Sequence, residues 1–254
     1  KEARACIEVA RAQVAQAIRA EPSEIIWTSG ATESINLALK GAMHLYQHRG
    51  KHLVTLQTEH KAVLDTCSAL EKEGCDVTYL SPLANGLLDL DQLKHALHRE
   101  TVLVSIMYVN NETGIIQDIL SIARLTRERG ILLHVDAAQS IGKVTLDVTN
   151  TPIDLLSLSA HKVYGPKGIG ALYLRKKPRV RVSSLLHGGG HEQGMRSGTL
   201  PTHQIVGMGE AFRLAGEHRV RDFNNAMRLR NLLISGLKNK YDLSPNTDLA
   251  YSVP

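Results

Sequence analysis

Short apolar runs alternate with segments of helical period along most of the chain. The runs are rich in Ile, Leu and Val and are bounded by Gly, Pro or polar residues, which is typical of strands. They predict strands at residues 25–28, 52–56, 77–80, 101–109, 131–135, 155–158 and 170–174. The chain opens in a helical pattern, and later segments with the same period predict helices at residues 32–48, 63–70, 90–97, 119–129 and 204–238.

This alternation predicts an α/β fold with a mostly parallel, doubly wound sheet and helices on both faces. Such a sheet binds its ligand in the crevice outside the carboxyl ends of its strands. Polar and glycine-rich motifs follow several of the predicted strands directly. We therefore expect the chemistry of the protein to lie at this edge.

Composition narrows the class of protein. Of the 254 residues, 43% are hydrophobic and 22% are charged, which indicates a sizeable core and argues against disorder. No apolar run is long enough to cross a bilayer, and no signal-peptide pattern opens the chain. The cysteines Cys6, Cys67 and Cys75 are widely spaced, which argues against a disulfide framework or a zinc site. We expect a reducing, cytoplasmic location and no membrane partner.

The chain is mildly basic, with 30 Lys and Arg against 25 Asp and Glu and a net charge of +5. Its densest basic run, at residues 175–179, follows a predicted strand and contains a proline. We interpret this run as a solvated loop rather than a nucleic-acid site, although the two look similar in sequence. The positive balance suits an enzyme whose cofactor and partners are anionic.

The first predicted strand is followed by SGATES at residues 29–34. Glycine permits a tight turn there, and the free amides of the next helix, with the Thr32 hydroxyl, could hold a phosphate. A plain Ser N-cap with a carboxylate in the first turn explains the same residues. Taken alone, the motif leaves both interpretations open.

Two further predicted strands are followed by motifs of interest: TEHK at residues 58–61 and NNETG at residues 110–114. His60 could stack on an aromatic ligand or move protons near neutral pH, although a lone histidine is usually structural. Asn111 could hydrogen-bond to a phenolic oxygen, whereas a simple turn also accounts for its motif.

Asp136 ends the predicted strand 131–135 in the motif HVDAAQ. The residues before it are nearly all apolar, so we expect the carboxylate to be shielded from water. A buried carboxylate is costly without a cation beside it. A protonated pyridine nitrogen is one such cation and would act as an electron sink, whereas an internal pair with Arg or Lys is the structural alternative.

Lys162 lies in the motif SAHKVYGPKGIG, directly after the predicted strand 155–158. Packing does not explain a lysine at this place. Desolvation would favour the free amine that imine formation needs, and Ser159 and His161 would reach a phosphate. The glycine-rich loop lacks the spacing of a P-loop and its final Ser or Thr, which excludes nucleotide binding by that motif. We therefore interpret Lys162 as the Schiff-base lysine of a pyridoxal 5′-phosphate (PLP) enzyme.

A last motif, HGGGHEQGMRSGT, covers residues 187–199. Two histidines and a glutamate could suggest a metal site, but three glycines between the histidines would leave the ligands poorly held. We therefore expect no metal. A glycine-rich loop that presents a hydroxyl and Arg196 to an anion fits better.

Together these motifs resemble the IscS/NifS-type cysteine desulfurases, which are fold-type I enzymes of the class V PLP-dependent aminotransferase family. The resemblance rests on SGATES, TEHKAV, VNNETG, HVDAAQS, SAHKVYGPKGIG and HGGGHEQGMRSGT, in the order of that family. It extends from the first helix to about residue 240. It implies a PLP-binding large domain at residues 1–220 and, at residues 221–254, a long-helix linker and the start of a small domain.

The resemblance also implies roles for individual residues. Lys162 would hold the cofactor and move the α-proton of the substrate, and His60 would stack on the ring and assist. Asp136 would pair with the ring nitrogen, while Gln139 and Asn111 would contact the phenolic oxygen. The residues implied at the phosphate are Ala31, Thr32, Ser159 and His161, with Thr199 reaching the phosphate of the neighbouring subunit in a homodimer.

The implied reaction converts L-cysteine to L-alanine and passes sulfur as a persulfide to an iron–sulfur scaffold protein and other sulfur acceptors, including those of tRNA thiolation. By this resemblance, the family's N-terminal segment would precede Lys1, and its persulfide cysteine and carboxylate-binding arginine would lie beyond Pro254. None of the three cysteines occupies that position, so we expect this chain alone to be inactive. Alternatives are another class V enzyme, such as a selenocysteine lyase or a small aminotransferase, and a non-catalytic sulfur-relay scaffold.

Overall fold

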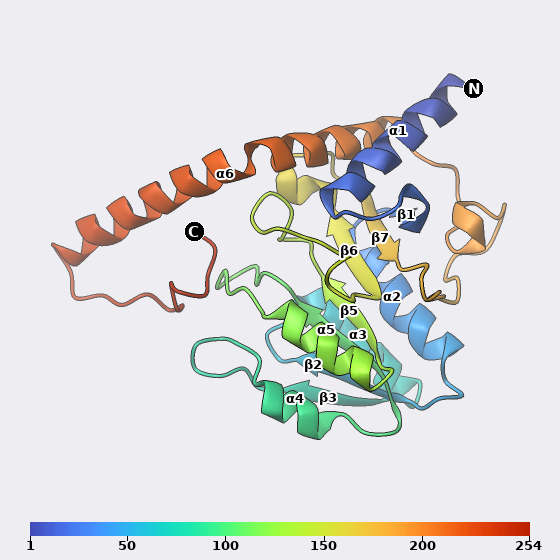
Figure 1. Ribbon diagram of the computed structural model, residues 1–254, viewed down its shortest axis with the longest axis horizontal. Coiled ribbons are helices and arrows are strands. Elements are labelled where there is room, and N and C mark those ends of the chain that lie inside the picture. The colour runs from blue at the N-terminus through green and yellow to red at the C-terminus, as the bar shows by residue number, and fades with distance from the viewer.

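Seven strands form one sheet in the order β1-β7-β6-β5-β4-β2-β3 (Figure 1). The computed structural model describes residues 1–254. The strands are β1 (Ile25–Thr28), β2 (His52–Leu56), β3 (Asp76–Leu80), β4 (Thr101–Met107), β5 (Leu132–Asp136), β6 (Leu155–Ser159) and β7 (Gly170–Leu174). Only β7 runs against the others, because it pairs antiparallel with both β6 and β1. The predicted mostly parallel sheet is confirmed.

Helices cover both faces of the sheet and bury a separate apolar core on each. They are α1 (Glu2–Ala17), α2 (Ala31–Leu45), α3 (Lys61–Lys72), α4 (Leu90–Ala96), α5 (Ile119–Glu128) and α6 (Thr202–Lys238). Alternate residues of a strand point to opposite faces. Val104 and Leu133 therefore pack with α1, α4, α5 and α6, while Leu103 and Leu132 pack with α2 and α3.

The long helix α6 packs against α1 over its first half and extends past the sheet over its second (Figure 1). Ile205, Met208 and Phe212 are fully buried in the first half, whereas Leu232 and Leu233 are exposed in the second. The residues after α6 fold back, and the Val253 amide donates to the Gly114 carbonyl at 2.9 Å. No helix combines the length and the apolarity that crossing a membrane requires.

The predicted elements match the observed ones closely, with small differences at their ends. The prediction for β4 is two residues too long, because the regular pairing with β5 stops at Met107 and Val109 instead forms an isolated bridge to Ile116. The interpretation of residues 175–179 as a solvated loop is wrong for Arg175. This side chain is buried and pairs with Asp154.

A buried ion pair fastens α1 to the glycine-rich segment before α6. Arg11 binds Glu192 through two contacts of 2.8 and 2.9 Å, and both residues are at most 9% exposed. The backbone amide of Trp27 donates to the same carboxylate at 2.8 Å, and the Arg11 guanidinium lies over the Trp27 ring. The pair therefore connects α1, β1 and the 3₁₀ helix Glu192–Gly194.

Replacing Glu192 by alanine is expected to lower the free energy of unfolding by about 3–5 kcal/mol, because it leaves the Arg11 charge buried and unpaired. Urea unfolding at neutral pH measures this loss. Glu217→Ala is the matched control, since Glu217 pairs with Arg213 on the exposed surface of α6 and should matter little. Equal losses in the two variants would contradict the prediction.

Candidate active site

The predicted site residues gather at one edge of the sheet, where the parallel strands β1, β2, β4, β5 and β6 have their carboxyl ends. This is the edge at which open α/β sheets bind ligands. The strand ends and the segments after them carry Ala31, Thr32, His60, Asn111, Asp136, Gln139, Ser159, His161 and Lys162. Thr199 comes from the separate segment that leads into α6.

Gly170 brings the two predicted phosphate-binding segments together. It pairs with Thr28 of β1 on one side and with Ser159 of β6 on the other. A Cβ atom at position 170 would lie only 2.7 Å from Gly30 and 2.6 Å from the Leu158 carbonyl. Because Gly170 has no side chain, the first turn of α2 and the end of β6 can lie side by side.

The N-terminus of α2 has no side-chain cap. Its N-cap residue is Gly30, at a φ of 156° that favours glycine, and no side chain accepts from the first amides of the helix. The alternative of a Ser N-cap is therefore wrong. The Ser29 amide instead donates to the Glu33 carboxylate at 2.7 Å. Free amides and the positive end of the helix dipole favour an anion at this place.

Asp136 is 2% exposed and has no ion-pair partner within 4.0 Å. Its Oδ1 accepts a hydrogen bond from the Ala138 amide at 2.9 Å. Burial raises the pKa of this carboxyl, while the Ala138 amide and the nearby charges of His60 and Lys162 act in the opposite direction. The internal Arg or Lys pair that the sequence left open is absent, so a cationic group of a ligand can serve as the partner.

His134 precedes Asp136 on the same face of β5 and is fully buried between Ser105 and Ser157, with hydrogen bonds of 2.8 Å to each hydroxyl. Burial lowers the pKa of this imidazole to about 3. His134 is therefore neutral and does not supply the missing cation.

His60 is exposed and is the N-cap of α3. Its Nδ1 accepts a hydrogen bond from the Ala62 amide at 3.0 Å. This contact fixes the ring at the start of the helix and leaves Nε2 for other partners. The sequence motif gave no sign of this capping role, because histidine is not a usual N-cap residue.

Lys162 lies in the 3₁₀ helix Ala160–Val163, which begins directly after β6. The expectation that its side chain is desolvated is wrong, since the side chain is exposed. It extends from a short surface turn beyond the end of the sheet. Behind it, the Ser159 hydroxyl and His161 Nδ1 are hydrogen-bonded at 2.9 Å. Partial burial, and then the positive charge of Lys162, lower the pKa of His161.

Gln139 has a partner that the sequence motifs did not single out. Lys143 Nζ donates to Gln139 Oε1 at 2.6 Å, and both side chains are half-buried. The two residues are joined by a turn in which Gly142 has a φ of 74°. In the sequence, the only sign of this contact is a lysine four residues after the glutamine. That spacing is too common to predict a contact by itself.

Asn111 and Thr199 are both exposed, and each stands in a loop held by other residues. Asn110 shapes the first loop, because its Oδ1 accepts from the amides of Glu112 and Thr113 at 2.9 Å. Neither Asn111 nor Thr199 makes a side-chain hydrogen bond within the chain. The implied roles of both remain predictions.

The expectation that Arg196 is presented to an anionic ligand is wrong. Arg196 binds the Glu33 carboxylate of α2 through contacts of 2.7 and 3.2 Å. Each partner moves the other's pKa toward the charged state, lowering that of Glu33 and raising that of Arg196. Arg196 therefore ties the glycine-rich segment to the first turn of α2. Glu192, in the same segment, is occupied by Arg11.

At the opposite end of the sheet, His52, Asp76 and His98 could supply three metal ligands. The nitrogens of His52 are already hydrogen-bonded to Thr101 at 2.8 Å and to Thr78 at 2.9 Å. A neutral imidazole with one donor and one acceptor satisfies both hydroxyls. We interpret His52 as a structural histidine.

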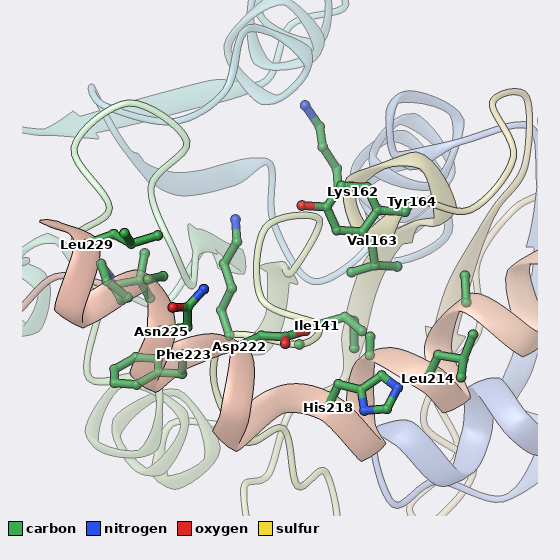
Figure 2. Close-up of a pocket in the computed structure, with 17 residues that line it drawn as sticks. Ile141, Lys162, Val163, Tyr164, Leu214, His218, Asp222, Phe223, Asn225 and Leu229 are labelled. Carbon is green, nitrogen blue, oxygen red and sulfur yellow. The ribbon is translucent and has the colours of Figure 1, made fainter.

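A cavity of about 540 Å³ lies beside Lys162. Figure 2 shows Lys162 and Tyr164 on one side and residues of α6, such as His218 and Phe223, on the other. Lys143 also lines this space. The cavity is of the size that holds small ligands in proteins.

The sequence profile of the family described as "Aminotransferase class-V" matches residues 1–249. The chain belongs to the class-V aminotransferase family. It is 59% identical over 253 residues to the cysteine desulfurase IscS of Vibrio campbellii, an alignment that covers 100% of this chain and 63% of that protein. The chain thus spans less than two thirds of the length of this curated relative.

Two solved structures extend the comparison. A NifS-like protein superposes with a TM-score of 0.96 at 40% identity, covering 100% of this chain and 69% of the other. The structure described as SspA in complex with cysteine has a TM-score of 0.80 at 49% identity and covers 83% and 61% of the two chains. These similarities confirm the resemblance to the IscS/NifS type and the predicted fold.

PLP is the cofactor of class-V aminotransferases, and the residues of this chain fit it. PLP carries an anionic phosphate, a basic ring nitrogen and an aldehyde that reacts with amines. In this chain, the uncapped amides of α2 can bind the phosphate, and the unpaired Asp136 carboxylate can pair with the ring nitrogen. The exposed Lys162 amine can react with the aldehyde.

Proposed function

We propose that this chain is the cofactor-binding part of a cysteine desulfurase that converts L-cysteine to L-alanine and passes the sulfur on as a persulfide. The observation that carries the proposal is the Asp136 carboxylate, which is buried, lacks an ion pair and lies near enough to Lys162 for the two charges to interact. The relative named cysteine desulfurase IscS supports this choice of reaction, and the neighbour solved with cysteine supports this substrate.

Three side chains would act at the ring and at the reacting carbon. Asp136 would pair with the ring nitrogen and keep it protonated, and His60 would lie against the ring. Lys162 would hold PLP covalently through Nζ and would take up and return the proton of the substrate's α-carbon. When bound, PLP supplies an electron-withdrawing ring that stabilises negative charge at that carbon.

The phosphate would be held by groups on either side of Gly170. The ring oxygen would be held by residues in the segments that follow β4 and β5. The amides of Ala31 and Thr32 at the start of α2 would face the phosphate, together with Ser159 and His161. Asn111 and Gln139 would donate hydrogen bonds to the ring oxygen. The Ser159–His161 hydrogen bond supports this arrangement, because it holds both groups at the end of β6.

We also propose an assembly and a location for the protein. Thr199 is exposed and would reach the phosphate of a neighbouring subunit, which implies a homodimer with shared sites. Residues 1–220 would form the large domain, and residues 221–254 would begin a small one, whose apolar residues could cover Leu232 and Leu233. A cytoplasmic enzyme of this kind would hand sulfur to an iron–sulfur scaffold protein and to other sulfur-acceptor proteins, including those of tRNA thiolation.

The activity is tested with PLP, L-cysteine and a thiol reductant, and alanine and sulfide are measured in the same sample. Because the chain covers only 63% of its curated relative, the assay uses the polypeptide at the full length of that relative. We expect equal amounts of alanine and sulfide. Transamination without sulfide would instead support a small aminotransferase, and strong preference for selenocysteine would support a selenocysteine lyase.

The chain itself allows a simpler test of cofactor binding. Adding PLP is expected to produce a visible absorbance that persists through dialysis, because Lys162 retains the cofactor covalently. A folded chain that gains no such absorbance would contradict the proposal and would favour a non-catalytic sulfur-relay scaffold.

A further inference from the structure

Lys143 makes one side-chain hydrogen bond, and its acceptor is a neutral amide. Its Nζ lies 2.6 Å from Gln139 Oε1, and no carboxylate lies within 4.0 Å of it. The side chain is half-buried and lines the cavity beside Lys162. A lysine in such surroundings loses solvation without gaining an ion pair, which is unfavourable for folding.

The titration of Lys143 agrees with this environment. Burial and then the positive charge of Lys162 lower the pKa of Lys143. The other titratable side chains that line the cavity are Tyr164, directly after the 3₁₀ helix of Lys162, and His218 and Asp222 from α6. None of these forms an ion pair with Lys143, so Gln139 is its one hydrogen-bond partner.

The contact determines which way the Gln139 amide faces. An ammonium group only donates hydrogen bonds, so it must bind the carbonyl oxygen of the amide. The amide group at Nε2 is then left to donate on the other side. Without Lys143, the side chain could rotate by 180° and present its oxygen instead, which would repel an anionic oxygen of a ligand.

We propose that Lys143 is a positioning residue that fixes the Gln139 amide so that Nε2 donates to the ring oxygen of PLP and favours the deprotonated form of that oxygen. This inference rests on the proposed function, because it uses Gln139 as a ligand of the ring oxygen. It adds to that function a residue that touches neither substrate nor cofactor and acts through Gln139.

The first test follows the visible absorbance of the PLP-loaded chain as a function of pH. Lys143→Met removes the donor and the positive charge while keeping an unbranched side chain that is only one atom shorter. The midpoint of the absorbance transition is expected to rise by about one pH unit, since loss of a nearby cation favours protonated forms. Lys143→Arg keeps the charge and the donors, so its midpoint should lie close to that of the wild type.

Lys94→Met is the matched control, because Lys94 is an exposed lysine of α4. It changes the net charge equally but should leave the midpoint unchanged. Thermal unfolding of each variant shows whether the fold is retained. A folded Lys143→Met chain with the wild-type midpoint would overturn the inference, as would equal shifts in Lys143→Met and Lys94→Met.

The second test needs no cofactor. Nuclear magnetic resonance of ¹³C-labelled lysine reports the pKa of Lys143 in the wild-type chain and in Gln139→Leu. Loss of the acceptor should lower that pKa further, because the ammonium form loses its hydrogen bond. An unchanged pKa would overturn the inference even where PLP binds normally. If wild-type protein gains no absorbance with PLP, the proposed function fails. A normal absorbance together with an unchanged Lys143 pKa in Gln139→Leu would overturn this inference alone.

Discussion

Lys162→Ala is expected to abolish the visible absorbance that the chain gains with PLP and, at full length, to lower the rate of alanine formation by about ten-thousand-fold or more. The amine at Nζ would serve both as the attachment point of the cofactor and as the base for the substrate proton, and alanine supplies neither. The side chain is exposed, so its removal leaves no cavity and should leave the free energy of unfolding nearly unchanged.

Absorbance spectra after dialysis, together with single-turnover formation of alanine, measure the effect. Lys167→Ala is the matched control, because Lys167 is an exposed lysine of the same loop. Only its backbone carbonyl is used, as the acceptor for Gln204. A Lys162→Ala protein that keeps the absorbance while Lys167→Ala loses it would show that the attachment point has been assigned to the wrong lysine.

Asp136→Asn is expected to have opposite effects on catalysis and on stability. Turnover should fall by about a hundredfold or more, because asparagine cannot hold the ring nitrogen protonated. Without cofactor, the same variant should be more stable than the wild type by about 1 kcal/mol, or roughly 2–4 °C in Tm. Asparagine keeps the Oδ1 acceptor for the Ala138 amide but carries no buried charge.

The sign of the stability effect follows from the raised pKa of Asp136 in the folded chain. Below the ordinary Asp pKa of 3.8, folded and unfolded states are both protonated and burial imposes no charge penalty. Above it, the unfolded state loses its proton first, so the wild type loses stability as pH rises through the folded pKa. The advantage of Asp136→Asn should therefore be larger at about pH 7 than at about pH 4, close to the ordinary Asp pKa.

Urea unfolding of the cofactor-free chains at both pH values provides the measurement. Asp91→Asn, an exposed position on α4, is the control and should show no such pH dependence. If Asp136→Asn were less stable than the wild type at neutral pH, the carboxylate would have a favourable partner in the folded chain. The assignment of the ring nitrogen as its partner would then be wrong.

The strands could be predicted because their signal is local. β1, β2 and β7 have the bounds that apolar runs between Gly, Pro and polar residues gave, and the positions of Asp136 and Lys162 at strand ends followed directly. Whether two strands pair parallel or antiparallel cannot be predicted in this way, because it depends on contacts between residues that are far apart in the sequence. The reversal of β7 beside β6 has no counterpart in the pattern of its five residues.

The electrostatic partners could not be predicted for the same reason. Arg196 looked available for a ligand because its partner Glu33 is 163 positions away. Glu192 looked like a member of a histidine motif, yet it binds Arg11 across 181 positions. The exposure of Lys162 was missed because an apolar strand before a residue says nothing about the turn that follows it.

The ion pair between Glu33 and Arg196 couples two parts of the chain energetically. Glu33 is in the first turn of α2, at the amides that face the proposed phosphate, and Arg196 stands three residues before Thr199. We expect a ligand that orders one end of this pair to favour order at the other, with a coupling free energy that is the same in both directions. A second subunit that engages the segment around Thr199 would therefore tighten anion binding at α2, and a bound anion would strengthen subunit association by an equal factor.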